Sequence, residues 1–243
     1  MSWLRKIDLE RFGPLIALVV LFAVSSVTSE YFLQTQNLLN ILRQVSYTGI
    51  IALGMTFVIV GGGIDLSVGS LTALAGGVGI LVLNRFGGGA GAIMLAVGTA
   101  LLVGAAGGAV NGFLVTVGRV APFIATLGTM AIYRSLTLYI ANAGEYRSSS
   151  ELYAAMGMGS FLWVPLPVWV FLVLALVLAV VLNLTPFGRY VCAVGSNERV
   201  AAYSAIRVDR IRFATYLLVG LTVGLSAVLL SSRMNSISSS NAA

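Results

Sequence analysis

Long apolar runs separated by short polar segments make up most of the chain. A membrane-spanning helix needs about 20 mainly apolar residues, and runs near this length recur along the sequence. Seven are candidates: residues 12–27, 45–60, 66–83, 91–117, 122–141, 164–184 and 213–231. The first two are short, and either flanking residues extend them or they lie partly within protein. Because a β-barrel would show short alternating segments instead, the pattern predicts an all-α fold, a polytopic transmembrane helix bundle of about seven spans.

The composition agrees with this prediction. Apolar residues make up 58% of the 243 residues and charged residues only 9%, whereas roughly 25% charged residues is usual for soluble domains. The mean hydropathy is +0.99. These values exclude a soluble enzyme, a disordered chain and a collagen-like fibre. The net charge of +6 does not indicate a nucleic-acid partner here, because the basic residues lie between the apolar runs.

Several residue types that enzymes need are rare or missing. The chain has no His, one Cys (Cys192) and one Lys (Lys6). A zinc site, an internal disulfide and a Ser-His or Cys-His nucleophile are therefore excluded. A phosphate-binding P-loop also needs a Lys after its glycines. The sequence predicts a protein that is not an enzyme, binds no cofactor or metal of its own, and does not hydrolyse ATP with its own residues.

The basic residues predict the orientation, since cytoplasmic loops carry an excess of Lys and Arg. A cytoplasmic N-terminus places nine basic residues inside: Arg5, Lys6, Arg11, Arg119, Arg189, Arg199, Arg207, Arg210 and Arg212. It places four outside: Arg43, Arg85, Arg147 and Arg233. A cleaved signal peptide is the alternative interpretation of the first run, but the acidic Asp8 and Glu10 in its leader argue against it.

Glycines indicate how the helices pack. The fourth run carries Gly104, Gly108 and Gly112 at four-residue spacing, so they share one helix face and allow another helix to approach closely. Ala73 and Gly77 repeat the pattern in the third run. The sequence therefore predicts tightly crossing helices.

A polar segment, GGGIDLSVGS over residues 61–70, interrupts the apolar pattern. Three glycines do not hold a helix well, and Asp65 stands where a helix restarts, as a preferred N-cap residue. Non-helical backbone at membrane depth is tolerated only where protein buries it or it lines a cavity. The segment is therefore either a tight cytoplasmic turn or a broken helix near a pathway, and the cap-and-turn role is favoured over contact with a transported solute.

Other polar residues lie within the apolar runs. Arg134 could extend to the outer surface or face a water-filled cavity. Asn111, Thr126 and Thr129 could serve a polar solute or join helices by hydrogen bonds. The candidates for a translocation path are Gly62, Gly63, Asp65, Ser67, Asn111, Thr126, Thr129 and Arg134. So few titratable groups argue against a proton-driven carrier.

Two longer polar segments lie between spans. Residues 142–162 fall outside in the predicted orientation, and residues 185–212 fall inside. Within the second, GSNERVAAYSAI (residues 195–206) has Ser196 or Asn197 as a helix cap and Glu198 in the first turn. Its alanines make a slim helix that could lie in a groove of a soluble partner or rest on lipid headgroups. The polar residues after Ser231 predict a loop.

Five stretches resemble a known family. They are NLLNILRQ (37–44), GMTFVIVGGGIDLSVGS (54–70), NGFLV (111–115), PFIATLGTM (122–130) and residues 187–206. Together they are similar to the permease subunits of monosaccharide ABC importers of the ribose, xylose and arabinose type. The resemblance extends over nearly the whole chain and implies that residues 1–243 are one transmembrane permease domain in a bacterial inner membrane. Family members usually continue further, so this domain is expected to be incomplete at its C-terminus.

The resemblance also implies partners and roles. A second permease copy would complete the membrane core, two cytoplasmic ATPase domains would bind ATP and Mg, and an external sugar-binding protein would deliver a monosaccharide for alternating access. Residues 195–206 would be the coupling helix to the ATPase, with Gly195, Ser196, Asn197, Glu198, Arg199, Ala201, Ala202 and Ile206. The outer candidates for docking the binding protein are Glu145, Arg147 and Glu151. Two alternatives remain open, a secondary carrier or passive channel and a non-transporting truncated fragment.

Overall fold

The computed structural model describes residues 9–142 and 144–238, with side chains from residue 12 to residue 237 apart from residue 143. The chain divides into two compact units, Met1–Leu42 and Arg43–Ala243. The basic residues Arg5 and Lys6, used for the orientation, lie outside the described residues, and so does the side chain of Arg11.

The first unit contains helix α1 (Leu9–Thr28) and the beginning of α2 (Thr35–Val60). The amide of Asn37 donates a hydrogen bond to the carbonyl oxygen of Phe32 (2.8 Å). The rings of Phe22 and Phe32 meet edge to face, with their centroids 5.0 Å apart. These contacts hold the turn between α1 and α2.

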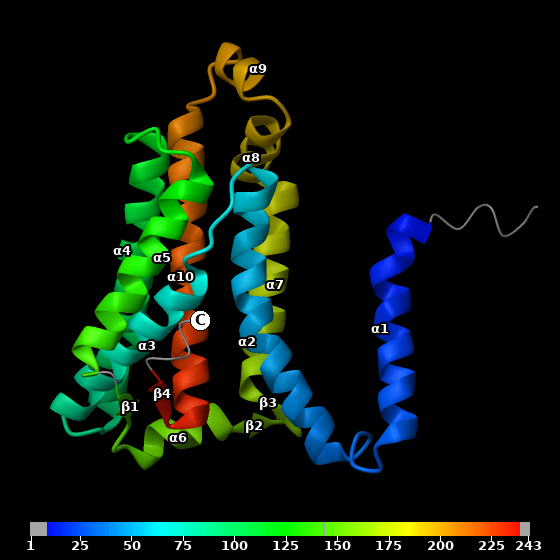
Figure 1. Cartoon of the computed structure of the whole chain (residues 1–243), viewed down its shortest axis with the longest axis vertical. Coiled ribbons are helices and arrows are strands. Elements are labelled where there is room, and N and C mark those ends of the chain that lie inside the picture. Colours follow the sequence, from blue (N-terminus) through cyan, green and yellow to red (C-terminus); the bar gives the residue numbers. More distant parts are fainter. Residues whose placement is uncertain (1–8, 143, 239–243) are drawn as a thin grey trace, which may run out of the picture. The chain divides into compact units, whose positions relative to one another are not determined.

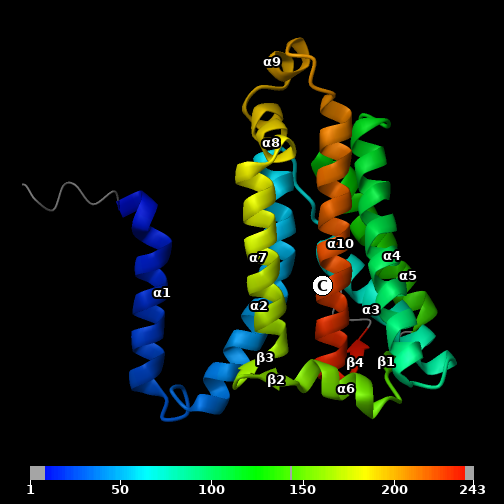
Figure 2. The same ribbon diagram turned by 180° about the vertical axis from the view of Figure 1, so that it is seen from behind.

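The second unit contains the rest of α2 and all later elements, and it is mainly helical (Figures 1 and 2). Its other helices are α3 (Val68–Arg85), α4 (Ala90–Thr116), α5 (Pro122–Ile140), α6 (Glu151–Met158), α7 (Leu166–Leu184), α8 (Pro186–Ser196), α9 (Glu198–Tyr203) and α10 (Val208–Met234). Its strands form two short antiparallel pairs, β1 (Glu145–Arg147) with β4 (Ser236–Ser238) and β2 (Ser160–Phe161) with β3 (Val164–Pro165). The predicted all-α bundle is therefore confirmed.

Six helices among the described residues, α2, α3, α4, α5, α7 and α10, are long and apolar enough to cross a membrane. The remaining predicted run is the shorter apolar part of α1, Phe12–Thr28. Two predicted spans, 45–60 and 213–231, are much shorter than their helices, α2 and α10. Apolar runs underestimate a helix because polar and charged residues such as Arg210 are tolerated at its ends, where their side chains reach water.

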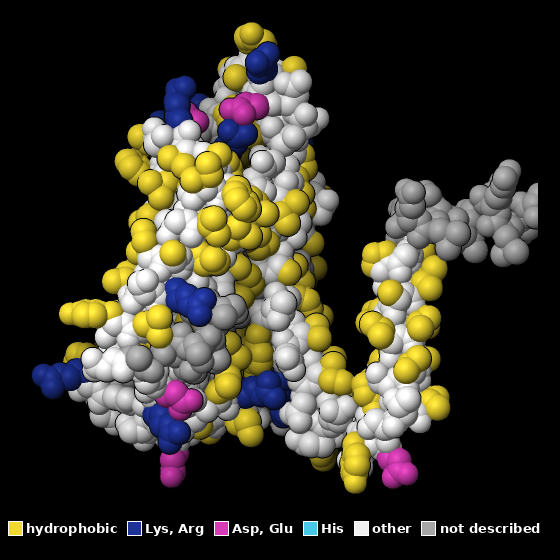
Figure 3. All heavy atoms as spheres, in the orientation of Figure 1, with side chains coloured by type: hydrophobic (Ala, Val, Ile, Leu, Met, Phe, Trp, Pro, Cys, Tyr) yellow, Lys and Arg dark blue, Asp and Glu magenta, His cyan; other side chains and the backbone are white. Residues whose placement is uncertain are grey.

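The second unit is built around α3. This helix packs against α4, α5 and α10, and most of its side chains are buried. On another side, α2 and α7 pack together through Phe57 and Leu178 and run side by side in both views (Figures 1 and 2). Most charged side chains visible on this unit lie near its two ends, with apolar side chains between them (Figure 3). This distribution suits a bundle embedded in lipid.

Helices α4 and α10 run in opposite directions and touch through glycines. A Cβ atom on Gly104 would meet the carbonyl oxygen of Gly220, and one on Gly108 would meet that of Tyr216. A Cβ atom on Gly224 would lie 2.6 Å from the carbonyl oxygen of Ala100. The predicted glycine face of α4 is therefore confirmed. Its partner on α10 is the pair Gly220 and Gly224, at the same four-residue spacing.

This contact predicts opposite effects for two substitutions on one helix. Gly108→Ala forces α4 away from α10 and should destabilise the protein by about 1–3 kcal/mol, the usual cost of overpacking. Gly98→Ala meets nothing within 4 Å and should stabilise the helix by up to about 1 kcal/mol. Thermal unfolding of the purified variants in detergent measures both. A Gly108→Ala protein that melts at or above the native temperature contradicts the close crossing.

Candidate functional site

Helix α2 ends in a glycine turn. The N–H of Gly63 donates to the carbonyl oxygen of Val58 (2.8 Å), and the N–H of Gly62 donates to that of Ile59 (3.0 Å). Gly62 has φ +79°. These two hydrogen bonds, with Gly62 in the left-handed conformation, form the Schellman motif that ends many helices. The positive φ explains why glycine stands at position 62.

The chain then enters the bundle before α3 begins. In Figure 1 the connection runs from the end of α2, beside α8, part of the way down the bundle to α3. The carbonyl oxygen of Ile64 accepts a hydrogen bond from the Tyr216 hydroxyl of α10 (3.0 Å). Residues 61–67 form this break between α2 and α3 and are too many for a tight turn, while a pathway beside the break stays a prediction. Surrounding protein supplies the partners that such backbone needs within a membrane.

Asp65 is the centre of a buried hydrogen-bond network. Its Oδ1 atom accepts from the N–H of Ser67 (2.8 Å) and from the Ser67 hydroxyl (2.7 Å), and its Oδ2 atom accepts from the Asn111 amide (3.1 Å). The residue is only 3% exposed. Asp65 is not the N-cap that the sequence predicts, because Ser67 occupies that position. Its carboxylate instead accepts the hydrogen bonds that hold the turn of residues 65–67, directly before α3.

Asn111 joins the break to two further helices. Its amide nitrogen also donates to the Ser67 hydroxyl (2.8 Å), and its Oδ1 atom accepts from the Thr129 hydroxyl of α5 (2.6 Å). Both Asn111 and Thr129 are buried. Tyr133, one turn further along α5, donates to the carbonyl oxygen of Gly107 on α4 (2.9 Å). The network therefore connects the loop before α3 with α4 and α5.

The other predicted path residues do not join this network. Thr126 is buried, but its hydroxyl donates to the carbonyl oxygen of Pro122 in its own helix (2.8 Å). Arg134 is exposed on α5. Across the part of the chain that the structure describes, no three or more His, Cys, Asp or Glu side chains gather as metal ligands. In this conformation the network locks the helix break, and a path role for its residues stays a prediction.

The segment predicted to be a coupling helix is divided in two. Helix α8 ends at Ser196, so Gly195 and Ser196 belong to it. Asn197 then caps α9 by accepting a hydrogen bond from the N–H of Val200 (3.1 Å). Ile206 follows the end of α9. Of the two predicted caps, Asn197 therefore has that position, and the helix itself is shorter than residues 195–206.

Helix α9 projects at one end of the bundle (Figures 1 and 2). One side is anchored by Ala201, which is buried with Val194 and Val208. The other carries side chains exposed to solvent: Glu198, Arg199, Val200, Ala202 and Tyr203. Tyr203 is 90% exposed. Exposed large apolar side chains are typical of a surface that contacts a protein partner or lipid, so both predicted roles of this segment stay open.

Glu198 and Gly195 also connect this end to the rest of the second unit. Glu198 forms an ion pair with Arg212 of α10, with 2.8 Å between Oε2 and the guanidinium nitrogen. A Cβ atom on Gly195 would overlap the carbonyl oxygen of Val60, so α8 lies directly on the last residue of α2. The requirement for glycine at position 195 depends on this distant contact and has no local signal.

The outer candidates share an exposed edge at the opposite end. On β1, Glu145 and Arg147 form an exposed ion pair (3.2 Å), because alternate residues of a strand point to the same side. Tyr146 between them points inward and is buried against Gly77. Glu151 is exposed at the start of α6. The three predicted docking residues are therefore all accessible, while their contact with a partner stays a prediction.

No sequence pattern predicts the contacts that hold the β1 end of the bundle together. The segment after Ser231 is not a loop, since α10 continues to Met234 and β4 then pairs with β1. Below them, the Tyr153 hydroxyl of α6 lies 2.7 Å from that of Ser231. Burial raises the pKa of Tyr153, and its hydrogen bond with Ser231 acts in the opposite direction. Such short strands give no periodic pattern from which to predict them.

Comparisons with known proteins agree with this architecture. Residues 37–243 match the model of a family described as "Branched-chain amino acid transport system / permease component". The ribose import permease of Bacillus subtilis (strain 168) is 40% identical over 94% of this chain and 70% of its own length. That of Escherichia coli (strain K12) is 41% identical over 91% and 69%. The L-arabinose ABC transporter permease of Azospirillum brasilense is 34% identical over 93% and 66%. No solved structure matches the chain.

Six helices long enough and apolar enough to span indicate a polytopic membrane protein, and the matched family makes it a transport protein. Within that class, the chain belongs to the family of monosaccharide permeases of ABC importers. It is a multi-pass inner-membrane protein and a transporter component, not an enzyme.

Two threonines of α5 provide a matched test of the network. Thr129→Val removes the hydroxyl that donates to Asn111 and should destabilise the protein by about 1 kcal/mol, the size of an interhelical hydrogen bond in a membrane. Thr126→Val removes a bond within its own helix and should change stability less. Thermal unfolding in detergent compares them. If Thr129→Val costs as much in an Asn111→Ala background as in the native protein, the two residues are not coupled.

Proposed function

We propose that the chain is the membrane-spanning subunit of an importer that moves ribose, or a closely related monosaccharide, into the cytoplasm by alternating access. Support for ribose comes from the ribose import permeases, which are 40% and 41% identical to this chain, whereas the arabinose permease is 34% identical. The observation that carries the proposal is α9, a capped and exposed helix at the end of a sugar-permease bundle.

Energy would come from a separate ATPase subunit that binds ATP and Mg. The chain has one lysine, in its N-terminal tail, and no P-loop. Helix α9 offers such a partner the charged side chains of Glu198 and Arg199 beside the apolar Val200 and Tyr203. Its buried Ala201 and the Glu198–Arg212 ion pair attach it to the bundle. A subunit that grips α9 would therefore also act on α8 and α10.

Alternating access would require the network at the helix break to change. In the present conformation, the network joins Asp65, Ser67, Asn111 and Thr129 by hydrogen bonds. If α4 and α5 move relative to α3, the same amide and hydroxyl groups become available to a sugar. A second permease copy would form the other wall of the path. At the outer end, Glu145, Arg147 and Glu151 would receive the sugar-binding protein.

The proposed orientation places α9 in the cytoplasm. In a Cys192→Ser background, Ser196→Cys should react with a membrane-impermeant maleimide only when the inner face of sealed vesicles is accessible. Ser160→Cys, at the opposite end of the bundle, is the matched control and should react only from outside. Both positions are exposed. Labelling of residue 196 from the outer face would contradict the orientation and leave α9 out of reach of an ATPase.

The coupling role is tested by changing the exposed face of α9 without breaking its ion pair. Arg199→Glu combined with Tyr203→Ala should reduce association with the co-expressed ATPase subunit at least about tenfold, because each 1.4 kcal/mol of lost contact energy is a factor of ten. Ribose-stimulated ATP hydrolysis should fall to the unstimulated rate in reconstituted vesicles. Co-purification and phosphate release measure the two effects.

The control is Arg189→Glu, which makes the same charge change at an exposed position of α8 and should leave both measurements unchanged. Native association and stimulation in the double variant would refute α9 as the coupling element. Ribose uptake by vesicles that contain the chain but no ATPase would instead favour a passive channel or secondary carrier.

A further inference from the structure

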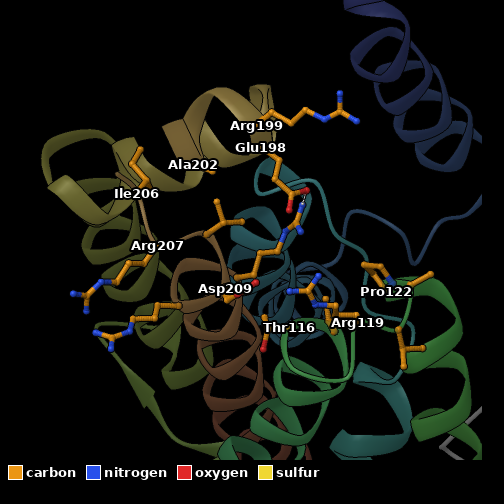
Figure 4. Close-up of a pocket in the computed structure, with 15 residues that line it drawn as sticks. Thr116, Arg119, Pro122, Glu198, Arg199, Ala202, Ile206, Arg207 and Asp209 are labelled. Carbon is orange, nitrogen blue, oxygen red and sulfur yellow. Dashed lines mark hydrogen bonds and ion pairs between the residues drawn. The ribbon is translucent and has the colours of Figure 1, made fainter. Parts of the chain in front are cut away.

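A groove lies between α9, which projects from the bundle, and the turn that joins α4 to α5. It has a volume of about 970 Å³. Its lining comes from the end of α4, the start of α5, α9 and the start of α10 (Figure 4). Because these are the ends of three candidate spans, we expect the groove to lie near the level of the lipid headgroups.

The groove is strongly basic. Five arginines line it: Arg119, Arg199, Arg207, Arg210 and Arg212. Two acidic residues, Glu198 and Asp209, also line it, and Glu198 is occupied by its ion pair with Arg212. In Figure 4, Arg119 points into the space beside that ion pair, Arg199 extends from α9, and Arg207 is directed away from them. The lining therefore keeps an excess of positive charge.

The same groove is also apolar. Its remaining lining is mainly aliphatic: Val115, Val120, Ala121, Pro122, Ile206 and Val208. Next to it along the chain, Val117 and Phe123 are 66% and 55% exposed. A free phosphate ion would leave this apolar surface uncovered. An amphiphile with an anionic head and an acyl tail would match both parts of the lining.

We propose that this groove binds the phosphate-bearing headgroup of an anionic phospholipid, with Arg119 as its principal cationic contact. Basic pockets between transmembrane helices on the cytoplasmic side are suited to acidic lipid headgroups. The acidic surface of a soluble partner is less suitable, because the floor of the groove is made by helix ends at headgroup depth. The groove shares Glu198 and Arg199 with the face of α9 that is proposed to dock the ATPase, so that subunit is tested below as a competitor of the lipid.

Arg119 occupies a conspicuous backbone position. It lies in the turn between α4 and α5 with φ +52°, in the left-handed region that residues with a side chain rarely adopt. The N–H of Val120, the next residue, donates to the carbonyl oxygen of Leu114 (3.1 Å) and closes the end of α4. This turn directs the guanidinium of Arg119 into the groove (Figure 4).

The test is an equilibrium titration of the purified full chain in a non-ionic detergent with a tail-labelled fluorescent phosphatidylglycerol. Unlabelled phosphatidylglycerol should displace the probe, while phosphatidylcholine should be at least about fivefold weaker, the contribution of one basic residue near an anionic surface. Inorganic phosphate at the same concentration should not displace it. Equal competition by phosphatidylcholine would overturn the proposal, and displacement by inorganic phosphate would assign the groove to a soluble anion.

Three variants locate the site. Arg119→Gln should weaken binding of the labelled lipid about fivefold, and Arg119→Lys, which keeps the charge, should restore most of the affinity. Arg189→Gln removes an exposed arginine that does not line the groove and should have no effect. Equal affinities in all three would refute the site. Displacement of the lipid by the ATPase subunit, together with unchanged lipid affinity in Arg119→Gln, would assign the groove to that protein.

Discussion

The buried carboxylate of Asp65 imposes the constraint on which the centre of the molecule depends. A carboxylate removed from water is tolerated only where hydrogen bonds replace its lost hydration. Ser67 supplies two of these bonds from the same loop, and Asn111 supplies another from α4. Because Asn111 also accepts from Thr129, α3, α4 and α5 must be correctly placed together. The helix break is therefore a property of three segments, the loop before α3, α4 and α5, and not of its glycines alone.

Helix α10 connects this centre to the end that projects from the bundle. Arg212 holds Glu198 of α9, and Tyr216, one turn further, donates to the carbonyl oxygen of Ile64 in the break. Further along the same helix, Gly220 and Gly224 lie against the backbone of α4. One helix thus touches the exposed coupling candidate, the interrupted backbone and the helix that carries Asn111. A conformational change at any of these points involves α10.

Much of the fold follows from the sequence, because long apolar runs in a membrane leave few alternatives to helices. The glycine face of α4 and the special position of Asp65 were also accessible, since each has a local pattern. Thr126 and Thr129 show where prediction stops. Both are buried hydroxyl residues on α5, and only the rotation of α5 relative to α4 decides which one reaches Asn111.

Contacts between distant residues were equally inaccessible. Tyr216 and Ile64 are 152 positions apart, and the β1–β4 pair joins a loop to the end of another helix. Periodicity reports which face of an element is apolar and says nothing about its neighbour. The start of α10 was missed for a related reason, since Arg210 and Arg212 interrupt the apolar run although the helix already begins at Val208.

The absent side chain of Gly195 has a mechanical consequence. Side chains between two helices act as a soft layer that can rearrange by rotamer changes when the helices are pushed together. No such layer exists where α8 meets the carbonyl group of Val60. The peptide backbones touch there, one residue before the three glycines that end α2. Pressure on α8 would thus reach the turn that ends α2 directly.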